Sequence, residues 1–210
     1  MDVASFKKLP MMGILRGIKE DILEPLTRAI ISSGLRTIEI AMNTEDAPKL
    51  IKNMKGLAKG SLIVGAGTVL TKKDLEAALK SGASFIVLPT LIKEVVEECV
   101  RENIPVFPGA LTPKEIKDAW DSGAAMVKVF PAKFFGPGYF KEIKGPFNDI
   151  ELLACGGVTP ENIKEFFKNG ASAIAFGGSI FKKEFLNKDN IHIIEENIRM
   201  FIANYGRLNT

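Results

Sequence analysis

The sequence MVKVFPAK at residues 126–133 places one lysine inside an apolar run that favours a β-strand. Because side chains alternate across a strand, Met126, Lys128 and Phe130 are expected on one face and the two valines on the other. Burial disfavours an ammonium and favours the neutral amine, which is the nucleophile of Schiff-base chemistry. From this stretch alone the commoner case is an edge-strand lysine whose stem covers apolar surface while its amine reaches water.

Outward from this stretch, short apolar runs alternate with helical patterns along the whole chain. They predict about eight strand–helix units, which is the lower end of the size range of a (β/α)8 TIM barrel. The expected strands cover residues 11–16, 37–43, 62–68, 85–89, 104–108, 126–130, 150–154 and 171–176. The expected helices cover residues 21–31, 46–54, 72–80, 94–101, a segment capped by Thr112, and residues 139–144, 160–168 and 190–203.

A closed α/β barrel is favoured over an open, doubly wound sheet. Ser-Gly or Asn-Gly pairs end alternate helices at 33–34, 81–82, 122–123 and 169–170, as expected of paired units. No Gly-x-Gly-x-x-Gly sequence follows the first strand, as it would in a dinucleotide-binding sheet. Without a linker or a shift in composition, residues 1–210 are expected to form one domain with a short N-terminal helix.

Composition narrows the function classes. A formal charge of +3 from 28 basic and 25 acidic residues is too weak to indicate nucleic acid or a membrane surface, yet suits a small anionic substrate. Two cysteines, Cys99 and Cys155, and a single histidine, His192, argue against a disulfide framework, a metal site and a histidine relay. Without a leader or a long apolar run, the expectation is a soluble cytoplasmic protein.

In such a barrel the site lies where the strands end, so residues from distant segments converge there. The first candidates are Arg16, Glu39, Thr68 and Lys128. If Lys128 points inward, Glu39 can share the interior with it and act as a general acid and base beside a nucleophile. Equally, Glu39 could be a buried ion-pair partner of Arg16.

Glycine-rich loops follow the last two strands. Gly156-Gly157 precedes Thr159-Pro160-Glu161, which reads as a helix start with Thr159 as N-cap, and Gly177-Gly178-Ser179 follows the final strand. Free N–H groups at such loops bind phosphate, and barrels often place phosphate there. The alternative is that these glycines only make tight turns.

Together these motifs resemble the bacterial 2-keto-3-deoxy-6-phosphogluconate aldolase / 4-hydroxy-2-oxoglutarate aldolase family. The resemblance runs from about residue 11 to residue 180 and rests on Ile38-Glu39-Ile40, Gly65-Ala66-Gly67-Thr68-Val69, Val127-Lys128-Val129-Phe130-Pro131, Gly156-Gly157-Val158 and Gly178-Ser179. It implies a class I aldolase that needs no metal or other cofactor, is usually a homotrimer, and cleaves a phosphorylated keto acid to pyruvate and glyceraldehyde 3-phosphate. Cleavage of 4-hydroxy-2-oxoglutarate to pyruvate and glyoxylate is a further activity that the resemblance implies.

The resemblance also implies roles for individual residues. Lys128 matches the Schiff-base lysine, and Glu39 matches the carboxylate that moves protons. Substrate-binding positions are matched by Arg16, Thr68, Asn43, Pro89 and Phe130, and the phosphate loops by Gly156, Gly157, Gly178 and Ser179.

Two positions bear on the substrate. Asn43, where the phosphogluconate branch commonly has arginine, looks closer to the phosphogalactonate branch, whereas Cys155 matches neither and is read as a small buried residue that ends a strand. Two other function classes stay open at this point. One is a sugar-phosphate epimerase or isomerase using the same lysine and glutamate, and the other is a sugar-phosphate sensor without catalysis.

Overall fold

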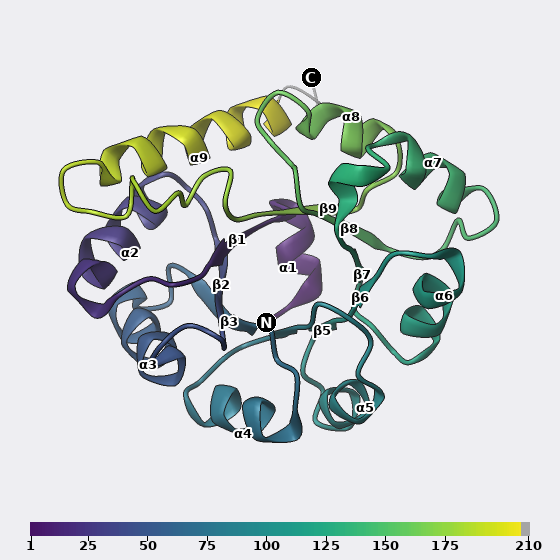
Figure 1. Ribbon diagram of the computed structural model, residues 1–210, viewed down its shortest axis with the longest axis horizontal. Coiled ribbons are helices and arrows are strands. Elements are labelled where there is room, and N and C mark those ends of the chain that lie inside the picture. Colours follow the sequence, from purple (N-terminus) through teal and green to yellow (C-terminus); the bar gives the residue numbers. More distant parts are fainter. Residues whose placement is uncertain (207–210) are drawn as a thin grey trace.

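Nine short strands carry the site, and the structure, a computed structural model, describes residues 1–206 of the chain. The strands are β1 (Met11–Leu15), β2 (Thr37–Ala41), β3 (Ile63–Gly67), β4 (Ile86–Val87), β5 (Val106–Phe107), β6 (Gly109–Ala110), β7 (Val127–Val129), β8 (Leu152–Cys155) and β9 (Ala173–Phe176). They lie in the order β5-β4-β3-β2-β1-β9-β8-β7-β6, and every pairing between them is parallel. Figure 1 shows the strands around a common centre with the helices outside them, except for the purple N-terminal helix, which overlaps that centre.

The sheet closes into a barrel through residues 106–110. Only Pro108 separates β5 from β6, so the two occupy one strand position and the barrel has the eight positions expected of a (β/α)8 fold. On one side the Leu88 N–H donates to the Phe107 carbonyl at 3.0 Å, and on the other the Lys128 N–H donates to the Pro108 carbonyl at 2.9 Å. The prediction of one strand over 104–108 is wrong in its bounds, because proline has no N–H with which to continue the ladder.

Helices surround the barrel, except for the short N-terminal helix, which lies over one of its ends. They are α1 (Val3–Lys8), α2 (Leu23–Ser32), α3 (Ala47–Ala58), α4 (Lys72–Lys80), α5 (Lys93–Arg101), α6 (Pro113–Asp121), α7 (Gly138–Lys144), α8 (Ile163–Lys168) and α9 (Ile191–Gly206), with short 3-10 turns η1 (Glu20–Ile22) and η2 (Ala132–Phe134). No helix within residues 1–206 is both long enough and apolar enough to cross a membrane.

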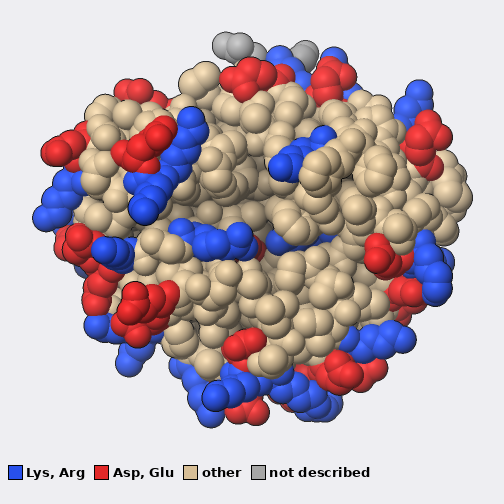
Figure 2. Space-filling model, viewed as in Figure 1, with Lys and Arg blue, Asp and Glu red and all other residues tan. Residues whose placement is uncertain are grey.

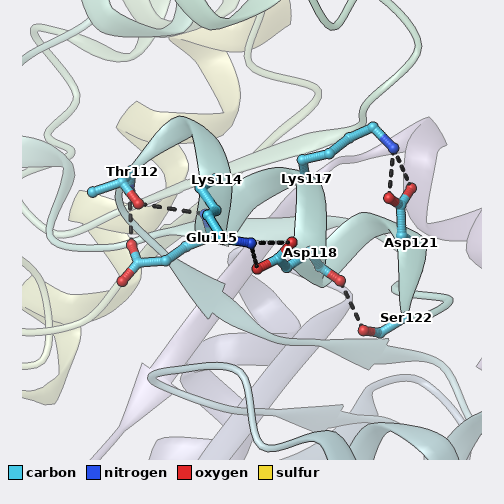
Figure 3. Close-up of polar contacts among 7 residues, drawn as sticks. All are labelled: Thr112, Lys114, Glu115, Lys117, Asp118, Asp121 and Ser122. Atoms are coloured by element: carbon cyan, nitrogen blue, oxygen red, sulfur yellow. Dashed lines mark hydrogen bonds and ion pairs between the residues drawn. The ribbon is translucent and has the colours of Figure 1, made fainter.

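The predicted start of α6 is confirmed (Figure 3). The Thr112 hydroxyl accepts from the Glu115 N–H at 3.4 Å, while the Glu115 carboxylate accepts from the Thr112 N–H at 2.8 Å. This reciprocal capping box satisfies backbone donors at the helix start. Ion pairs one turn apart, Lys114–Asp118 at 2.8 Å and Lys117–Asp121 at 2.5 Å, then cover the solvent face.

The predicted start of α8 is wrong. Thr159, expected as the N-cap, lies in a turn, and the helix begins at Ile163. The Asn162 side chain accepts from the Thr159 N–H at 2.8 Å and donates to the Gly157 carbonyl at 2.8 Å. These two bonds fold residues 157–162 into a separate turn beside Gly157, so helical geometry is delayed by three residues.

Apolar residues form an inner and an outer layer. Met126 packs inside the barrel with Phe85, Phe107 and Leu153, whereas Val127 and Val129 belong to the layer between strands and helices. The alternation predicted for this strand is therefore confirmed. Helix α1, which Figure 1 shows behind the barrel's centre, contributes Phe6, whose ring centroid lies 6.0 Å from that of Phe107. Since the Met1 amine also donates to the Ser84 carbonyl before β4, α1 closes the end where the strands begin.

Candidate active site

A cavity of about 720 Å³ lies at the end of the barrel where the strands finish. Figure 2 shows a hollow over the barrel's centre, with basic side chains inside it. Ten of the residues predicted for the site line this cavity: Arg16, Asn43, Thr68, Pro89, Lys128, Phe130, Gly156, Gly157, Gly178 and Ser179. The remaining one, Glu39, is buried near Arg16 and Lys128, whose charges act on its carboxyl group. The structure therefore brings all of these residues together.

Lys128 lies in the middle of β7 and is only 7% exposed. In the sheet Lys128 is paired with Gly109 of β6 on one side and with Leu153 of β8 on the other, so β7 is not an edge strand. Its amine lines the cavity and lies 5.3 Å from the centroid of the Phe130 ring. The reading of Lys128 as an edge-strand lysine is wrong, because its side chain points into the end of the barrel rather than across an outer surface.

Glu39 occupies the centre of β2 and is 1% exposed. Its Oε2 atom has no hydrogen-bond partner within residues 1–206. Burial raises the pKa of this carboxyl, and the positive charges of Lys128 and Arg16 oppose that rise. Burial thus favours the protonated form of this carboxyl group and the two cations favour its charged form, a balance that suits a group that both gives and takes a proton.

Gly67 makes room for that carboxyl group. A Cβ atom at Gly67 would lie 2.4 Å from Glu39 Oε1 and 2.6 Å from its Cδ. The two residues sit on the paired strands β2 and β3, so the missing side chain on β3 is the space that the carboxyl fills. No feature of the sequence identified this packing role in advance.

Arg16 and Thr68 form one end of the cavity. The guanidinium of Arg16 donates to the Thr68 hydroxyl at 3.2 Å, and no ion pair joins Arg16 to Glu39 within the described chain. The ion-pair alternative for Glu39 is therefore wrong. Thr68 has φ of +54°, a left-handed conformation that is costly for a β-branched residue and that clusters at functional sites. A guanidinium beside a hydroxyl can bind the carboxylate group of a ligand, because both can donate hydrogen bonds to it and the guanidinium adds a positive charge.

The two glycine-rich loops form the opposite end. Gly156 and Gly157 both have positive φ, +92° and +81°, and the Ser179 hydroxyl ties the loops together by donating to the Val158 carbonyl at 3.1 Å. In residues 1–206 the backbone N–H groups of Gly156, Gly157, Gly178 and Ser179 have no backbone carbonyl as a partner. Clustered free donors of this kind bind anions.

Two more side chains of chemical interest line the cavity. Lys133 ends the MVKVFPAK stretch and lines the cavity, but the sequence does not predict this, because a lysine in a turn after a strand is ordinary and carries no signal of a site. Cys155 ends β8 and is buried, as expected of a small residue there. Burial raises the pKa of its thiol, which disfavours the thiolate that a catalytic cysteine needs. Within residues 1–206 no three His, Cys, Asp or Glu side chains gather as metal ligands would.

Comparison with known proteins shows which protein family the chain resembles in sequence and structure. The family model "KDPG and KHG aldolase" matches residues 3–197. The chain is 34% identical over 176 residues, 83% of its length and 86% of the relative's, to 2-dehydro-3-deoxy-6-phosphogalactonate aldolase of Escherichia coli. It is 35% identical over 159 residues, 75% of its length and 70% of the relative's, to 2-dehydro-3-deoxy-phosphogluconate aldolase of Pseudomonas aeruginosa. A solved structure described as native KDPGal superposes with a TM-score of 0.89 at 30% identity, covering 95% of this chain and 96% of that one.

A buried lysine and a buried carboxyl group at one end of a (β/α)8 barrel, with free backbone N–H groups in the loops after the last two strands, fit the class of Schiff-base aldolases, which are carbon–carbon lyases. Within that class, the chain belongs to the KDPG and KHG aldolase family. The family resemblance and the enzyme class expected from the sequence are confirmed, and the epimerase alternative is not favoured.

Proposed function

We propose that this protein cleaves a 2-keto-3-deoxy-6-phospho sugar acid to pyruvate and glyceraldehyde 3-phosphate, with Lys128 as the Schiff-base residue. The observation that carries the proposal is the position of the Lys128 amine, buried on an interior strand at the floor of the cavity and within electrostatic range of the Glu39 carboxyl. In this arrangement a nucleophilic amine and a group that both gives and takes protons meet in one site.

The first half of the reaction forms the Schiff base. The neutral Lys128 amine attacks the C2 carbonyl of the substrate and gives a carbinolamine. Glu39, in its protonated form, donates a proton to the C2 hydroxyl, which leaves as water and gives the iminium. Burial raises the pKa of Glu39 and so favours the protonated form that makes this donation.

In the second half the C3–C4 bond breaks. The Glu39 carboxylate takes the proton of the C4 hydroxyl, the electron pair of the C3–C4 bond moves into the iminium, and the aldehyde leaves. The resulting enamine takes this proton back from Glu39 at C3, which gives the iminium of pyruvate. The Glu39 carboxylate then takes a proton from the water that adds to the iminium, and collapse of the carbinolamine releases pyruvate and regenerates the Lys128 amine.

We propose that the two ends of the cavity hold the two anionic groups of the substrate. Arg16, Thr68 and Asn43 bind the carboxylate next to C2, while Pro89 and Phe130 enclose the carbon chain. Gly156, Gly157, Gly178 and Ser179 bind the phosphate. The free N–H groups of the loops and the hydrogen bond between Arg16 and Thr68 support this orientation.

The galactonate-derived substrate is the proposed preference, because Asn43 and not an arginine lines the cavity. A lactate-dehydrogenase-coupled assay on the gluconate-derived, the galactonate-derived and the unphosphorylated 4-hydroxy-2-oxoglutarate substrates tests this. We expect pyruvate from all three and the highest kcat/KM with the galactonate derivative. Absence of pyruvate from every substrate would refute the aldolase proposal, and deuterium uptake by the substrate without pyruvate would favour an epimerase.

For the assembly we propose a cytoplasmic homotrimer in which residues 1–210 form one folding unit. Phe134 and Phe135 support an interface, because these large apolar side chains are 71% and 57% exposed, directly after Lys133 in the chain. Sedimentation equilibrium should give three times the chain mass of 22.9 kDa. A monomer at micromolar concentration would contradict the trimer.

A further inference from the structure

Lys133 lies at the phosphate end of the cavity, on the turn η2 directly after β7. A Cβ atom placed on Gly157 would lie 2.5 Å from the Lys133 Cβ and 3.3 Å from its Cα. The stem of Lys133 therefore fills the space beside the Gly156–Gly157 turn and forms part of its wall. Lys133 thus lies beside a turn whose own backbone N–H groups, those of Gly156 and Gly157, have no backbone carbonyl as a partner within residues 1–206.

The charge of Lys133 is uncompensated. Within residues 1–206 it takes part in none of the ion pairs, and its amine lies 5.0 Å from the centroid of the Phe134 ring. Among the side chains that line the cavity, Arg16, Lys128 and Lys133 are basic and none is acidic. Arg16 belongs to the carboxylate end and Lys128 to the reacting carbon, which leaves Lys133 as the cation for a second anionic group.

We propose that the Lys133 ammonium binds the phosphate group of the substrate and sets the preference of this enzyme for phosphorylated over unphosphorylated keto acids. This inference rests on the proposed function of the site. A phosphate held only by backbone N–H groups gains hydrogen bonds without a full countercharge, whereas an ammonium adds a charge-assisted bond. Lys133 is a binding residue, so its removal should weaken substrate binding and leave the chemistry at Lys128 unchanged.

The test compares Lys133→Met with Lys133→Arg and with a matched control, Lys141→Met. Lys141 is an exposed lysine of α7 that lies outside the cavity and has no ion pair in the described chain. For Lys133→Met we expect KM for the phosphorylated substrate to rise about tenfold to a hundredfold, as for loss of a charged hydrogen bond. We expect kcat/KM for 4-hydroxy-2-oxoglutarate to stay within twofold, Lys133→Arg to recover most of the loss, and Lys141→Met to behave as the wild type.

A binding measurement separates this inference from the proposed function. Inorganic phosphate is titrated into each variant by calorimetry, without substrate. Weaker phosphate binding by Lys133→Met alone supports the inference even if the wild type cleaves none of the sugar acids. Equal phosphate affinity in all variants, equal losses on phosphorylated and unphosphorylated substrates, or no phosphate binding by the wild type would overturn it while leaving the aldolase proposal intact.

Discussion

Replacing Gly67 with alanine is expected to slow cleavage about a hundredfold while the fold is retained. The added Cβ would lie 2.4 Å from Glu39 Oε1, whereas a normal contact requires about 3.5 Å. Gly67 is held on an interior strand, where its carbonyl accepts from the Met42 N–H at 2.7 Å, so the backbone cannot retreat. The Glu39 carboxyl group must therefore move by about 1 Å, and a displacement of that size costs about 10²-fold in rate.

The loss corresponds to about 2.7 kcal/mol of transition-state stabilisation and should fall on kcat. The lactate-dehydrogenase-coupled assay measures it, and circular dichroism checks that Gly67→Ala is folded. Gly56→Ala is the matched control, because Gly56 lies in α3 with no atom within 4 Å of the added Cβ. This control should gain about 0.5–1 kcal/mol of stability, since alanine favours a helix, and should keep the wild-type kcat.

A kcat for Gly67→Ala within threefold of the wild type would contradict the proposal that Gly67 leaves the space in which Glu39 acts. It would mean either that Glu39 moves no proton in the rate-limiting step or that its position is not fixed by Gly67. A loss of activity that accompanies unfolding would be uninformative, so the stability of each variant is measured by denaturant unfolding first.

Two further predictions concern the same end of the site. Because burial raises the pKa of Glu39 in the folded protein, the unfolded chain loses this proton first as pH rises, and the wild type loses stability above the ordinary pKa of glutamate. Glu39→Gln should therefore have a higher Tm than the wild type at pH 8, by about 2–4 °C for each kcal/mol gained in the free energy of unfolding. The difference in Tm should vanish near pH 4. A difference in Tm that does not change with pH would contradict the raised pKa of Glu39. Thr68→Gly should relieve the strain of a φ of +54° and raise stability by about 1 kcal/mol while raising KM, because Arg16 loses the hydroxyl to which it donates; unchanged KM would show that this hydroxyl plays no part in binding.

Much of the fold could be predicted because its signals are local. Buried parallel strands read as short apolar runs, and helix ends carry their own caps, so α4 and α6 were located from sequence alone. The predicted ends of a strand and of a helix are wrong where a side chain interferes with the regular backbone hydrogen bonds. Pro108 interrupts a strand because it lacks an N–H, and the Asn162 side chain delays α8 by holding a turn.

The candidate site was predictable as far as its residues stand out chemically. Lys128 and Glu39 are ionisable groups in apolar strands, and burial is costly for both, so each signals a function. Gly67 and Lys133 gave no such signal. The role of Gly67 depends on the space that a side chain on the next strand fills, and that of Lys133 depends on its packing against Gly157, which lies 24 residues further along the chain.

The most direct test of the central claim is to trap the Schiff base. The protein is incubated with pyruvate and sodium borohydride, digested, and analysed by peptide mass spectrometry. We expect one stable pyruvate adduct, located on Lys128, which is absent from Lys128→Ala and present in Lys141→Met. No mass shift under trapping conditions, or an adduct on another lysine with Lys128 unmodified, would contradict it.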